Sequence, residues 1–332
     1  MSTFDPQPDT QIHIGTLTYA FMPQRLLPGD TPNTYVIEGQ EGFVYVLRNL
    51  EDDALWALKV LKPAYRSERV AQVTSALSQY GNTPGFSLSQ RTCLTRSAFS
   101  QLIAQFPALE YSLLMPWLPW KTWAGLMRSP DASLAYTRQQ ALDLAKTTAL
   151  VLHELEQHGN AHTDIAGGNV MYTSNFEQVE LIDLEGLYVP KVLPPKRLSY
   201  GSPGYQHRRP GKHGQWSQYG DRFAGAVLLT EMLTWWNPLV RAQTPRNAPT
   251  LFLPEELQKP VESRWQIVRD VLWSLDPTLL NLFDQAWGSL HLKHCPDFMT
   301  WLNCLSRVKS ETPSPSASSS QSPSTFQRTT SV

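Results

Sequence analysis

The feature that most constrains this sequence is a run of polar side chains between an expected helix and a short apolar strand. Apolar residues recur at helical spacing over residues 137–158, and Gly159 suits the left-handed backbone that ends many helices. Asp164 follows closely, and Asn169 directly precedes the apolar residues 170–172. A carboxylate and an amide fixed between two regular elements indicate a binding or catalytic site.

A second acidic position follows in the segment Leu181-Ile-Asp183-Leu-Glu-Gly186. There a carboxylate ends an expected buried strand, and a turn glycine comes soon after it. Phosphoryl transfer requires metal ions on the phosphates, a carboxylate that takes the proton of the attacking hydroxyl, and a cation on the phosphate oxygens. Asp164 suits the role of base, and Asn169 and Asp183 offer the oxygen ligands that Mg²⁺ prefers.

The composition fits one large folded domain or two smaller lobes with apolar cores. Of the 332 residues 41% are hydrophobic, and a formal net charge of −1 gives no electrostatic reason to expect a nucleic-acid partner. The three cysteines, Cys93, Cys295 and Cys304, lack the spacing of a disulfide framework, so we expect reduced thiols in a cytoplasmic protein. His291 and His294 beside Cys295 match no zinc-binding spacing, which favours ordinary side chains over a metal site.

We expect no signal peptide and no membrane segment. Residues 1–10 are polar and include Asp5 and Asp9, unlike the apolar core of a signal peptide. The most apolar stretch, residues 223–239, contains Glu231 and is too short and too polar to span a bilayer. Residues 309–332 are almost entirely Ser, Thr, Pro and Gln, which cannot bury a core, so we expect a disordered tail.

The remaining pattern predicts strands first and helices afterwards. Runs rich in β-branched and apolar residues predict strands over residues 35–37, 43–47, 55–61, 86–94 and 109–115, with one helix over about residues 67–80. Helical spacing predicts further helices over residues 137–158, 218–235, 261–275, 277–287 and 296–305. The sequence therefore predicts a β-rich first third and a mainly helical remainder.

Together these motifs resemble those of the protein kinase superfamily. His162-x-Asp164-x4-Asn169 followed by Asp183-x-x-Gly186 is similar to the catalytic loop and the metal-binding triplet of that family. Four further segments match in the family's order: Gly39-x-x-Gly42 resembles a shortened glycine-rich loop, Ala57-Leu-Lys59 the third-strand lysine motif, Gly201-Ser-Pro-Gly204-Tyr205 the end of an activation segment, and Asp221 the buried aspartate that bonds the loop backbone. The resemblance covers about residues 33–306.

The resemblance implies an α+β, two-lobed protein-kinase-like fold, with a small antiparallel sheet and one helix in the N-lobe and a larger, mainly helical C-lobe. It places an N-terminal extension at residues 1–30, the N-lobe at 31–116, the C-lobe at 117–308 and the tail at 309–332. It also implies ATP and Mg²⁺ as cofactors. Lys59 would hold the phosphates, Asp164 would be the base, and Asn169 and Asp183 would bind the metal.

The same resemblance implies where adenine would bind. Met115 stands at the gatekeeper position that ends the last N-lobe strand, and Leu118 would supply a backbone N–H to the base. Val44, Ala57 and Met171 would enclose the adenine, because nucleotide pockets are mainly apolar with a few polar groups.

Two departures from the family pattern affect the phosphate-binding residues. The third glycine of the loop is missing, so Gly39 and Gly42 also suit a plain hairpin turn. The helix after Lys59 lacks a mid-helix glutamate, and Glu68 falls in its first turn, where the helix dipole alone favours a carboxylate. We therefore expect Lys59 to lie nearer Asp183 when no nucleotide is bound. The triplet also carries leucine in place of the usual aromatic residue, and an added acid at residue 185.

Two further departures affect the catalytic loop and the activation segment. Thr163 stands where many protein kinases have arginine, so we expect activity without phosphorylation of the activation segment. Residues 206–209 stand where that segment normally ends with a glutamate. These traits resemble a divergent bacterial Ser/Thr protein-kinase-like branch. Because members of that branch are often encoded beside metal-dependent protein phosphatases, such a phosphatase is the expected antagonist.

We expect phosphorylation of Ser or Thr in a protein substrate, including autophosphorylation of the tail. Two alternatives remain. A small-molecule kinase of the aminoglycoside or choline type shares His-x-Asp-x4-Asn and an Asp-x-Glu triplet, and a nucleotide-binding pseudokinase scaffold would explain the missing helix glutamate. The 38-residue separation of Asp183 from Asp221 favours a protein kinase, because small-molecule kinases generally lack an activation segment.

Overall fold

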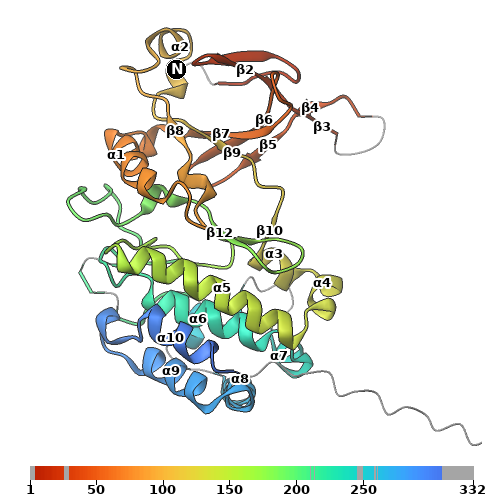
Figure 1. Ribbon diagram of the computed structural model, residues 1–332, viewed down its shortest axis with the longest axis vertical. Helices are drawn as coiled ribbons and strands as arrows, with labels where there is room; N and C mark the ends of the chain where they lie inside the picture. The colour runs from red at the N-terminus through yellow and green to blue at the C-terminus, as the bar shows by residue number, and fades with distance from the viewer. Residues whose placement is uncertain are drawn as a thin grey trace, which may run out of the picture.

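The computed structural model describes residues 4–25, 30–209, 211–212, 214–244, 250–257, 259 and 261–308. Within this part of the chain, an antiparallel sheet occupies the N-terminal third and helices form most of the remainder (Figure 1). The predicted α+β class is confirmed. The predicted disordered tail, residues 309–332, lies outside the described residues.

The larger sheet has seven antiparallel strands in the order β1-β2-β6-β7-β9-β8, and β5 also pairs with β6. Its strands are β1 (Gln11–Ile14), β2 (Leu17–Phe21), β5 (Val36–Glu38), β6 (Gly42–Asn49), β7 (Leu55–Leu61), β8 (Thr92–Cys93) and β9 (Leu113–Pro116). A separate pair consists of β3 (Pro23–Gln24) and β4 (Asn33–Thr34), and a second sheet of β10 (Lys121–Thr122), β11 (Val170–Tyr172) and β12 (Val179–Leu181). The central strand β7 has the predicted bounds.

The N-terminal residues belong to the larger sheet. The sequence predicts residues 1–30 as an extension, yet β1 and β2 pair with each other and β2 pairs with β6. Because side chains alternate along a strand, Ile12 and Ile14 share the buried face of β1. They pack with Tyr19 and Phe21 in an apolar cluster that includes Leu58 of β7. Strands on both sides of the predicted boundary therefore share one core.

The strand β7 separates two cores, because successive side chains point to opposite faces of a sheet. Leu58 and Val60 pack on the face that β1 and β2 cover. Ala57 belongs to the large apolar cluster formed with the helices, and Lys59 lies on the same face as Ala57. A lysine on a buried face requires an acidic partner, because an isolated buried charge is costly.

The strand predicted over residues 86–94 is wrong for most of its length. Residues Ser87–Ser89 form a short 3₁₀ helix, and only β8 pairs with a neighbouring strand. The backbone N–H and the hydroxyl of Ser87 both donate to the Glu180 carboxylate, so this run bonds a side chain instead of a strand. The strand predicted over residues 109–115 begins only at Leu113, and the helix over residues 100–105 is not predicted.

Helices pack around α5 and α6, which lie against each other with α10 beside them (Figure 1). The helices are α1 (Glu68–Leu77), α2 (Ser100–Gln105), α3 (Trp123–Arg128), α4 (Pro130–Ala135), α5 (Arg138–Gln157), α6 (Arg222–Thr234), α7 (Pro238–Gln243), α8 (Glu262–Leu275), α9 (Pro277–Gly288) and α10 (Phe298–Leu305). Short 3₁₀ helices are η1 (Pro63–Tyr65), η2 (Ser78–Tyr80), η3 (Ser87–Ser89), η4 (Pro107–Leu109), η5 (Leu184–Gly186), η6 (Pro254–Leu257) and η7 (Leu292–His294).

The predicted helices over residues 137–158, 261–275 and 277–287 are confirmed, with bounds that differ by at most one residue at each end. A capping box of Thr137 and Gln140 begins α5, because each side chain bonds the backbone of the other. None of the described helices combines the length and the apolar character needed to cross a bilayer. The three cysteines are free thiols.

Candidate functional site

Lys59 is the centre of a buried cluster of charges. It lies on β7, opposite Val44 of β6 and Leu113 of β9, and its side chain is 5% exposed. The Lys59 Nζ atom lies 2.8 Å from Asp183 Oδ1 and 2.7 Å from Glu185 Oε2. The expected proximity of Lys59 to Asp183 is confirmed. These two ion pairs join the larger sheet to the residues that follow β12.

Glu185 is a central member of this cluster whose role the sequence does not reveal. Its second carboxylate oxygen, Oε1, accepts a hydrogen bond from Arg91 Nη1 at 2.7 Å, and both side chains are buried. Burial raises the pKa of Glu185, but Lys59 and Arg91 outweigh burial and lower that pKa to about 2. Glu185 is therefore ionised at neutral pH and compensates two buried cations.

Lys59 stays protonated for the complementary reason. Burial alone would lower the pKa of Lys59, but the carboxylates of Glu185, Asp183 and Glu41 raise it above its ordinary value. Arg91 and Arg69 also interact with these carboxylates, so three cations and three carboxylates meet in this cluster.

Helix α1 reaches the cluster through an arginine instead of a glutamate. Glu68 is exposed in the first turn of α1. Arg69 donates from Nη1 to the backbone oxygen of Glu185 at 2.5 Å and from Nη2 to that of Leu187 at 2.8 Å. Its guanidinium also lies 4.8 Å from the ring centre of Trp216. These contacts hold the backbone of Glu185 against α1.

The loop over residues 162–169 is positioned by a buried carboxylate. Asp221, at the start of α6, accepts hydrogen bonds from the backbone N–H groups of His162 at 2.6 Å and Thr163 at 2.7 Å. The hydrogen bonds predicted for Asp221 are therefore present. Burial raises the pKa of Asp221 to about 6, although His162 and these two hydrogen bonds act in the opposite direction. His162 Nε2 also lies 2.7 Å from the backbone oxygen of Ile182, which precedes Asp183.

Two residues beside these groups have a left-handed backbone. Thr163 has φ of 68° and Asp183 has φ of 61°. A residue with a side chain is strained in this region, and such strain persists where the surroundings fix the conformation, as at functional sites. The hydrogen bond from the Thr163 N–H to Asp221, and that from His162 to the Ile182 oxygen, supply part of that fixation.

Asp164 and Asn169 lie side by side in the loop. Asn169 Nδ2 donates to the backbone oxygen of Asp164 at 2.8 Å and lies 3.5 Å from its carboxylate. The Asp164 Oδ1 atom accepts a hydrogen bond from the Ser202 hydroxyl at 2.9 Å. The candidate base therefore contacts both the candidate metal ligand and the segment that follows β12.

Asn169 and Asp183 fit a metal-binding role that is shared with phosphate oxygens. The Nδ2 atom of Asn169 is bonded to Asp164, so its Oδ1 atom is left to act as a ligand, and Asp183 contacts Lys59 through Oδ1. Proteins hold Mg²⁺ through one or two carboxylates together with substrate phosphates and water, and this donor pair suits that arrangement. Within the described ranges, no three His, Cys, Asp or Glu side chains are grouped to hold a metal by themselves.

Three of the residues predicted to bind ATP, namely Val44, Ala57 and the gatekeeper Met115, lie on the Lys59 face of the sheet. Ala57 of β7 pairs with Met115 of β9, and Val44 of β6 pairs with Lys59. Cross-strand partners point to the same face of a sheet. Val44, Ala57 and Met115 also belong to or pack against one apolar cluster. The structure therefore gathers these three residues beside Lys59.

Leu118 and Met171, the other two residues predicted to contact adenine, differ in their relation to this apolar cluster. Leu118 packs against the same apolar cluster, and its backbone N–H forms no hydrogen bond with the part of the chain that the structure describes. This free donor suits the predicted bond to adenine. Met171 is half-buried on β11, where it pairs with Thr122 and Glu180, and it is not among the described residues of that cluster.

The turn between β5 and β6 has a glycine at each end, Gly39 and Gly42, and the two glycines have different structural roles. The Gly39 N–H donates to the Gly42 carbonyl at 2.8 Å and closes the turn. A Cβ atom at Gly42 would lie 2.4 Å from the Val60 oxygen, so contact with β7 already requires glycine there. Glu41 in this turn lies 3.8 Å from Lys59 Nζ, and burial raises the pKa of Glu41. Glu41 therefore brings this turn close to Lys59. The close contact with β7 is sufficient to explain why residue 42 is glycine.

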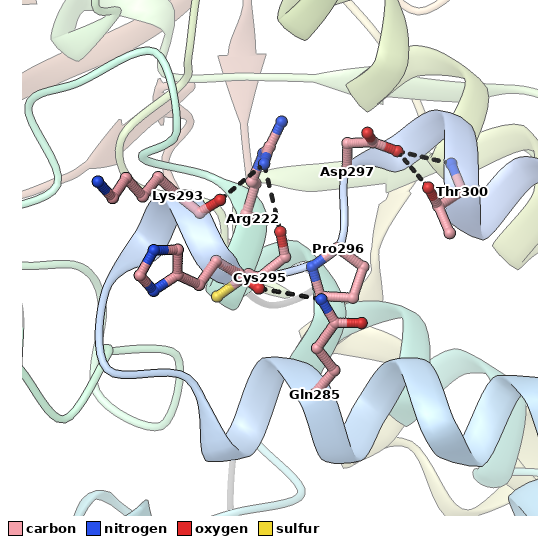
Figure 2. Close-up of a pocket in the computed structure, with 8 residues that line it drawn as sticks. Arg222, Gln285, Lys293, Cys295, Pro296, Asp297 and Thr300 are labelled. Carbon is pink, nitrogen blue, oxygen red and sulfur yellow. Dashed lines mark hydrogen bonds between the residues drawn. The ribbon is translucent and has the colours of Figure 1, made fainter.

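A separate hollow of about 420 Å³ shares no lining residue with the Lys59 cluster (Figure 2). Arg222 of α6 donates to the backbone oxygens of Lys293 and Cys295 and pairs with Glu156. Asp297 accepts hydrogen bonds from the backbone and hydroxyl of residue 300 at the start of α10. Because these polar groups satisfy one another, the hollow is explained by local packing and is not the candidate site.

No protein-family model matches this chain, and no curated protein sequence matches it. The strongest part of the site's geometry is the convergence of Lys59, Asp183 and Glu185 from distant parts of the sequence.

Proposed function

We propose that this chain is an ATP- and Mg²⁺-dependent protein kinase with a two-lobed, kinase-like architecture, and that it phosphorylates Ser or Thr. The observation that carries the proposal is the contact of Lys59 with Asp183 and Glu185, near a loop that holds Asp164 and Asn169. This set combines a cation for phosphate oxygens, a carboxylate base and two oxygen donors for a metal. Those are the groups that phosphoryl transfer requires.

In the proposed reaction, Lys59 exchanges one carboxylate contact for the phosphate oxygens. Asp183 is the partner that gives way, because its side chain is 52% exposed, whereas that of Glu185 is 7% exposed and is also held by Arg91. Asn169 and Asp183 would hold Mg²⁺ against the phosphates, where the ion supplies neutralisation of their charge.

Asp164 accepts the proton of the attacking hydroxyl in this proposal. Its Oδ1 atom bonds Ser202, so a substrate hydroxyl either replaces Ser202 or approaches the other carboxylate oxygen. A base acts on a proton that moves in the transition state, so its effect falls on turnover and not on nucleotide affinity.

The residues after β12 favour a protein substrate over a small molecule. Ser202 contacts Asp164, and the Tyr205 hydroxyl donates to Glu231 of α6 at 2.6 Å. These two bonds hold a long segment beside the candidate base. An extended surface next to the base suits a polypeptide that passes over it.

A thermal-shift experiment tests nucleotide binding. ATP with Mg²⁺ should raise the melting temperature of the protein, because a ligand that binds the folded state stabilises it by mass action. Asp183→Asn should remove most of the rise, while Asp131→Asn, a matched change at an exposed position of α4, should keep it. An equal rise in Asp183→Asn would contradict the metal role of Asp183. The absence of any rise in the unchanged protein would overturn the proposed nucleotide binding.

A further inference from the structure

The segment over residues 186–220, here called the basic segment, contains no acidic residue. Six of the chain's 28 lysines and arginines lie in it, and all 29 aspartates and glutamates lie outside it. Its cations are Lys191, Lys196, Arg197, Arg208, Arg209 and Lys212. Because the whole chain has a formal net charge of −1, the basic segment is a positive region on a chain whose remainder is acidic.

Five of these six cations are exposed, and within the described ranges none of the five forms an ion pair. Arg208 differs, because it is half-buried and donates from Nη2 to the backbone oxygen of Trp287 at 2.7 Å. The positive charge of the other five therefore has no acidic partner within the described part of the chain. Unpaired charge of one sign on a surface favours encounter with a partner of the opposite sign.

Close in the sequence to two of these cations, two runs of backbone make one tight contact. The backbone N–H of Gln215 donates to the Ser199 oxygen at 3.0 Å. A Cβ atom at Gly214 would lie 2.3 Å from that same oxygen, so glycine is needed for the close approach of the two runs. Arg197 lies two residues before Ser199, and Lys212 lies two residues before Gly214. The two cations therefore flank one defined junction.

This junction lies near the candidate base. Ser202, three residues after Ser199, donates to Asp164 Oδ1 at 2.9 Å. Arg197 and Ser202 are five positions apart in the sequence, so their backbones are at most about 18 Å apart. An extended peptide advances about 3.3 Å per residue. Arg197 is thus within reach of a substrate side chain up to about five positions from a hydroxyl at Asp164.

We propose that the basic segment selects protein substrates in which Asp or Glu residues flank the accepting Ser or Thr. The inference rests on the proposed kinase function and specifies its substrate class. Carboxylates of the substrate pair with Arg197 and Lys212 while the hydroxyl reaches Asp164. The tail of this chain carries a single acidic residue, Glu311, within residues 309–332, so it is a poorer substrate than an acidic segment.

The test uses three labelled peptides that have one central serine and differ only in the flanking residues, which are Glu, Gln or Lys. Binding to the full chain is followed by fluorescence anisotropy, and transfer from ATP with Mg²⁺ is followed by mass spectrometry. The Glu peptide should bind about five- to tenfold more tightly than the Gln peptide, because each exposed ion pair contributes modestly. The difference should shrink as salt rises from about 0.05 to 0.5 M, since the screening length falls.

Charge reversal identifies the surface. Arg197→Glu with Lys212→Glu should remove the preference for the Glu peptide and favour the Lys peptide. Lys146→Glu with Arg307→Glu is the matched control, because it makes the same charge change at exposed positions on α5 and after α10. The control should retain the preference of the unchanged protein. Equal melting temperatures of the two double variants show that both are folded.

The outcomes separate this inference from the kinase proposal. Equal binding of the Glu and Gln peptides, or a preference that survives charge reversal, overturns the substrate inference. Tight binding of the Glu peptide without transfer to any peptide supports the surface and contradicts the kinase proposal. If charge reversal lowers transfer to all three peptides equally, the inference is overturned. The cations would then act within the basic segment itself, for example by pairing with a phosphate on Ser199 or Tyr200.

Discussion

Two buried glutamates, one beside the larger sheet and one among the helices, show two different ways to accommodate a buried carboxyl group. Glu185, beside the larger sheet, contacts the cations Lys59 and Arg91. Glu231, inside α6, accepts hydrogen bonds only from neutral groups, which are the Tyr205 hydroxyl at 2.6 Å, the Trp123 indole N–H at 3.1 Å and the Leu251 backbone N–H at 2.6 Å. Burial raises the pKa of Glu231 to about 7, whereas the two cations lower that of Glu185 to about 2.

The difference indicates that the two glutamates have different tasks. A permanent charge at Glu185 keeps Lys59 ionised and fixes the position of its ammonium group. A carboxyl group at Glu231 that is easily neutralised joins α6 to Tyr205 of the basic segment without a buried ion pair. The expected glutamate is absent at residues 206–209, and Glu231 supplies an acidic anchor from a different element.

Among the variants that test this comparison, the largest predicted effect comes from removing the cation of the charged cluster. Lys59→Met should lower kcat/KM for ATP-dependent transfer by about 10²–10³, the scale observed when one preorganised electrostatic group is lost from an active site. Steady-state kinetics measures this loss. Lys146→Met, the same change at an exposed position of α5, should leave the rate unchanged. A loss of less than tenfold for Lys59→Met would show that Lys59 does not act on phosphate.

The second prediction separates the two candidate partners of Lys59. Glu185→Gln leaves Lys59 and Arg91 undercompensated, and removing one member of a buried ion pair typically costs about 3–5 kcal/mol of stability. Glu68→Gln, the same change on an exposed residue, should lower activity by less than about tenfold, or roughly 1.4 kcal/mol of barrier. Melting curves and kinetics on both variants check this. A severe loss of activity in Glu68→Gln, with none in Glu185→Gln, would instead identify Glu68 as the functional partner of Lys59.

The dependence of folding stability on pH in the acidic range should also change in Glu185→Gln. Because the folded-state pKa of Glu185 is below its ordinary value of 4.5, its contribution to stability is present above about pH 4.5 and is lost as pH falls toward about 2. Glu185→Gln should lack this loss. Unfolding by denaturant across that pH range measures it.

The smallest predicted effect concerns Glu231. Its folded-state pKa lies above the ordinary value of 4.5, so the folded protein retains a proton that the unfolded chain releases, and stability falls as pH rises from about 4.5 to 7. Asp221, with a pKa raised to about 6, contributes in the same direction. Glu231→Gln should flatten the decline and leave the share of Asp221. An unchanged pH profile in Glu231→Gln would contradict the neutral anchor and weaken the contrast with Glu185.

Short motifs predict the candidate site residues and miss the residues that contact and position them. Lys59, Asp164 and Asp183 stand in local patterns whose residue types and spacing are visible in the sequence. The role of Glu185 depends on Arg91, which lies 94 residues away, and no local pattern joins the two. The fold shows the same limit, since the predicted strand at residues 86–94 is mostly replaced because the distant Glu180 accepts the Ser87 hydrogen bonds.

The periodicity of apolar residues predicted helices and strands correctly where the apolar positions in the sequence are also the buried positions in the structure. The strand β7 and the helices α5, α8 and α9 have almost their predicted bounds, because each has one clear apolar pattern and defined ends. The strands β1 and β2 were not predicted, because each is short and its strand conformation depends on pairing with the other and with β6.

The central claim is that Asp164 is the base of an ATP-dependent transfer to a protein hydroxyl. The most direct measurement incubates the chain with ATP, Mg²⁺ and a serine peptide flanked by Glu residues, and follows the phosphate by mass spectrometry. The account predicts transfer by the unchanged protein and a loss of turnover of about 10²–10⁴ in Asp164→Ala, with the ATP-induced rise in melting temperature retained. No transfer by the unchanged protein, or equal transfer by Asp164→Ala, would contradict it.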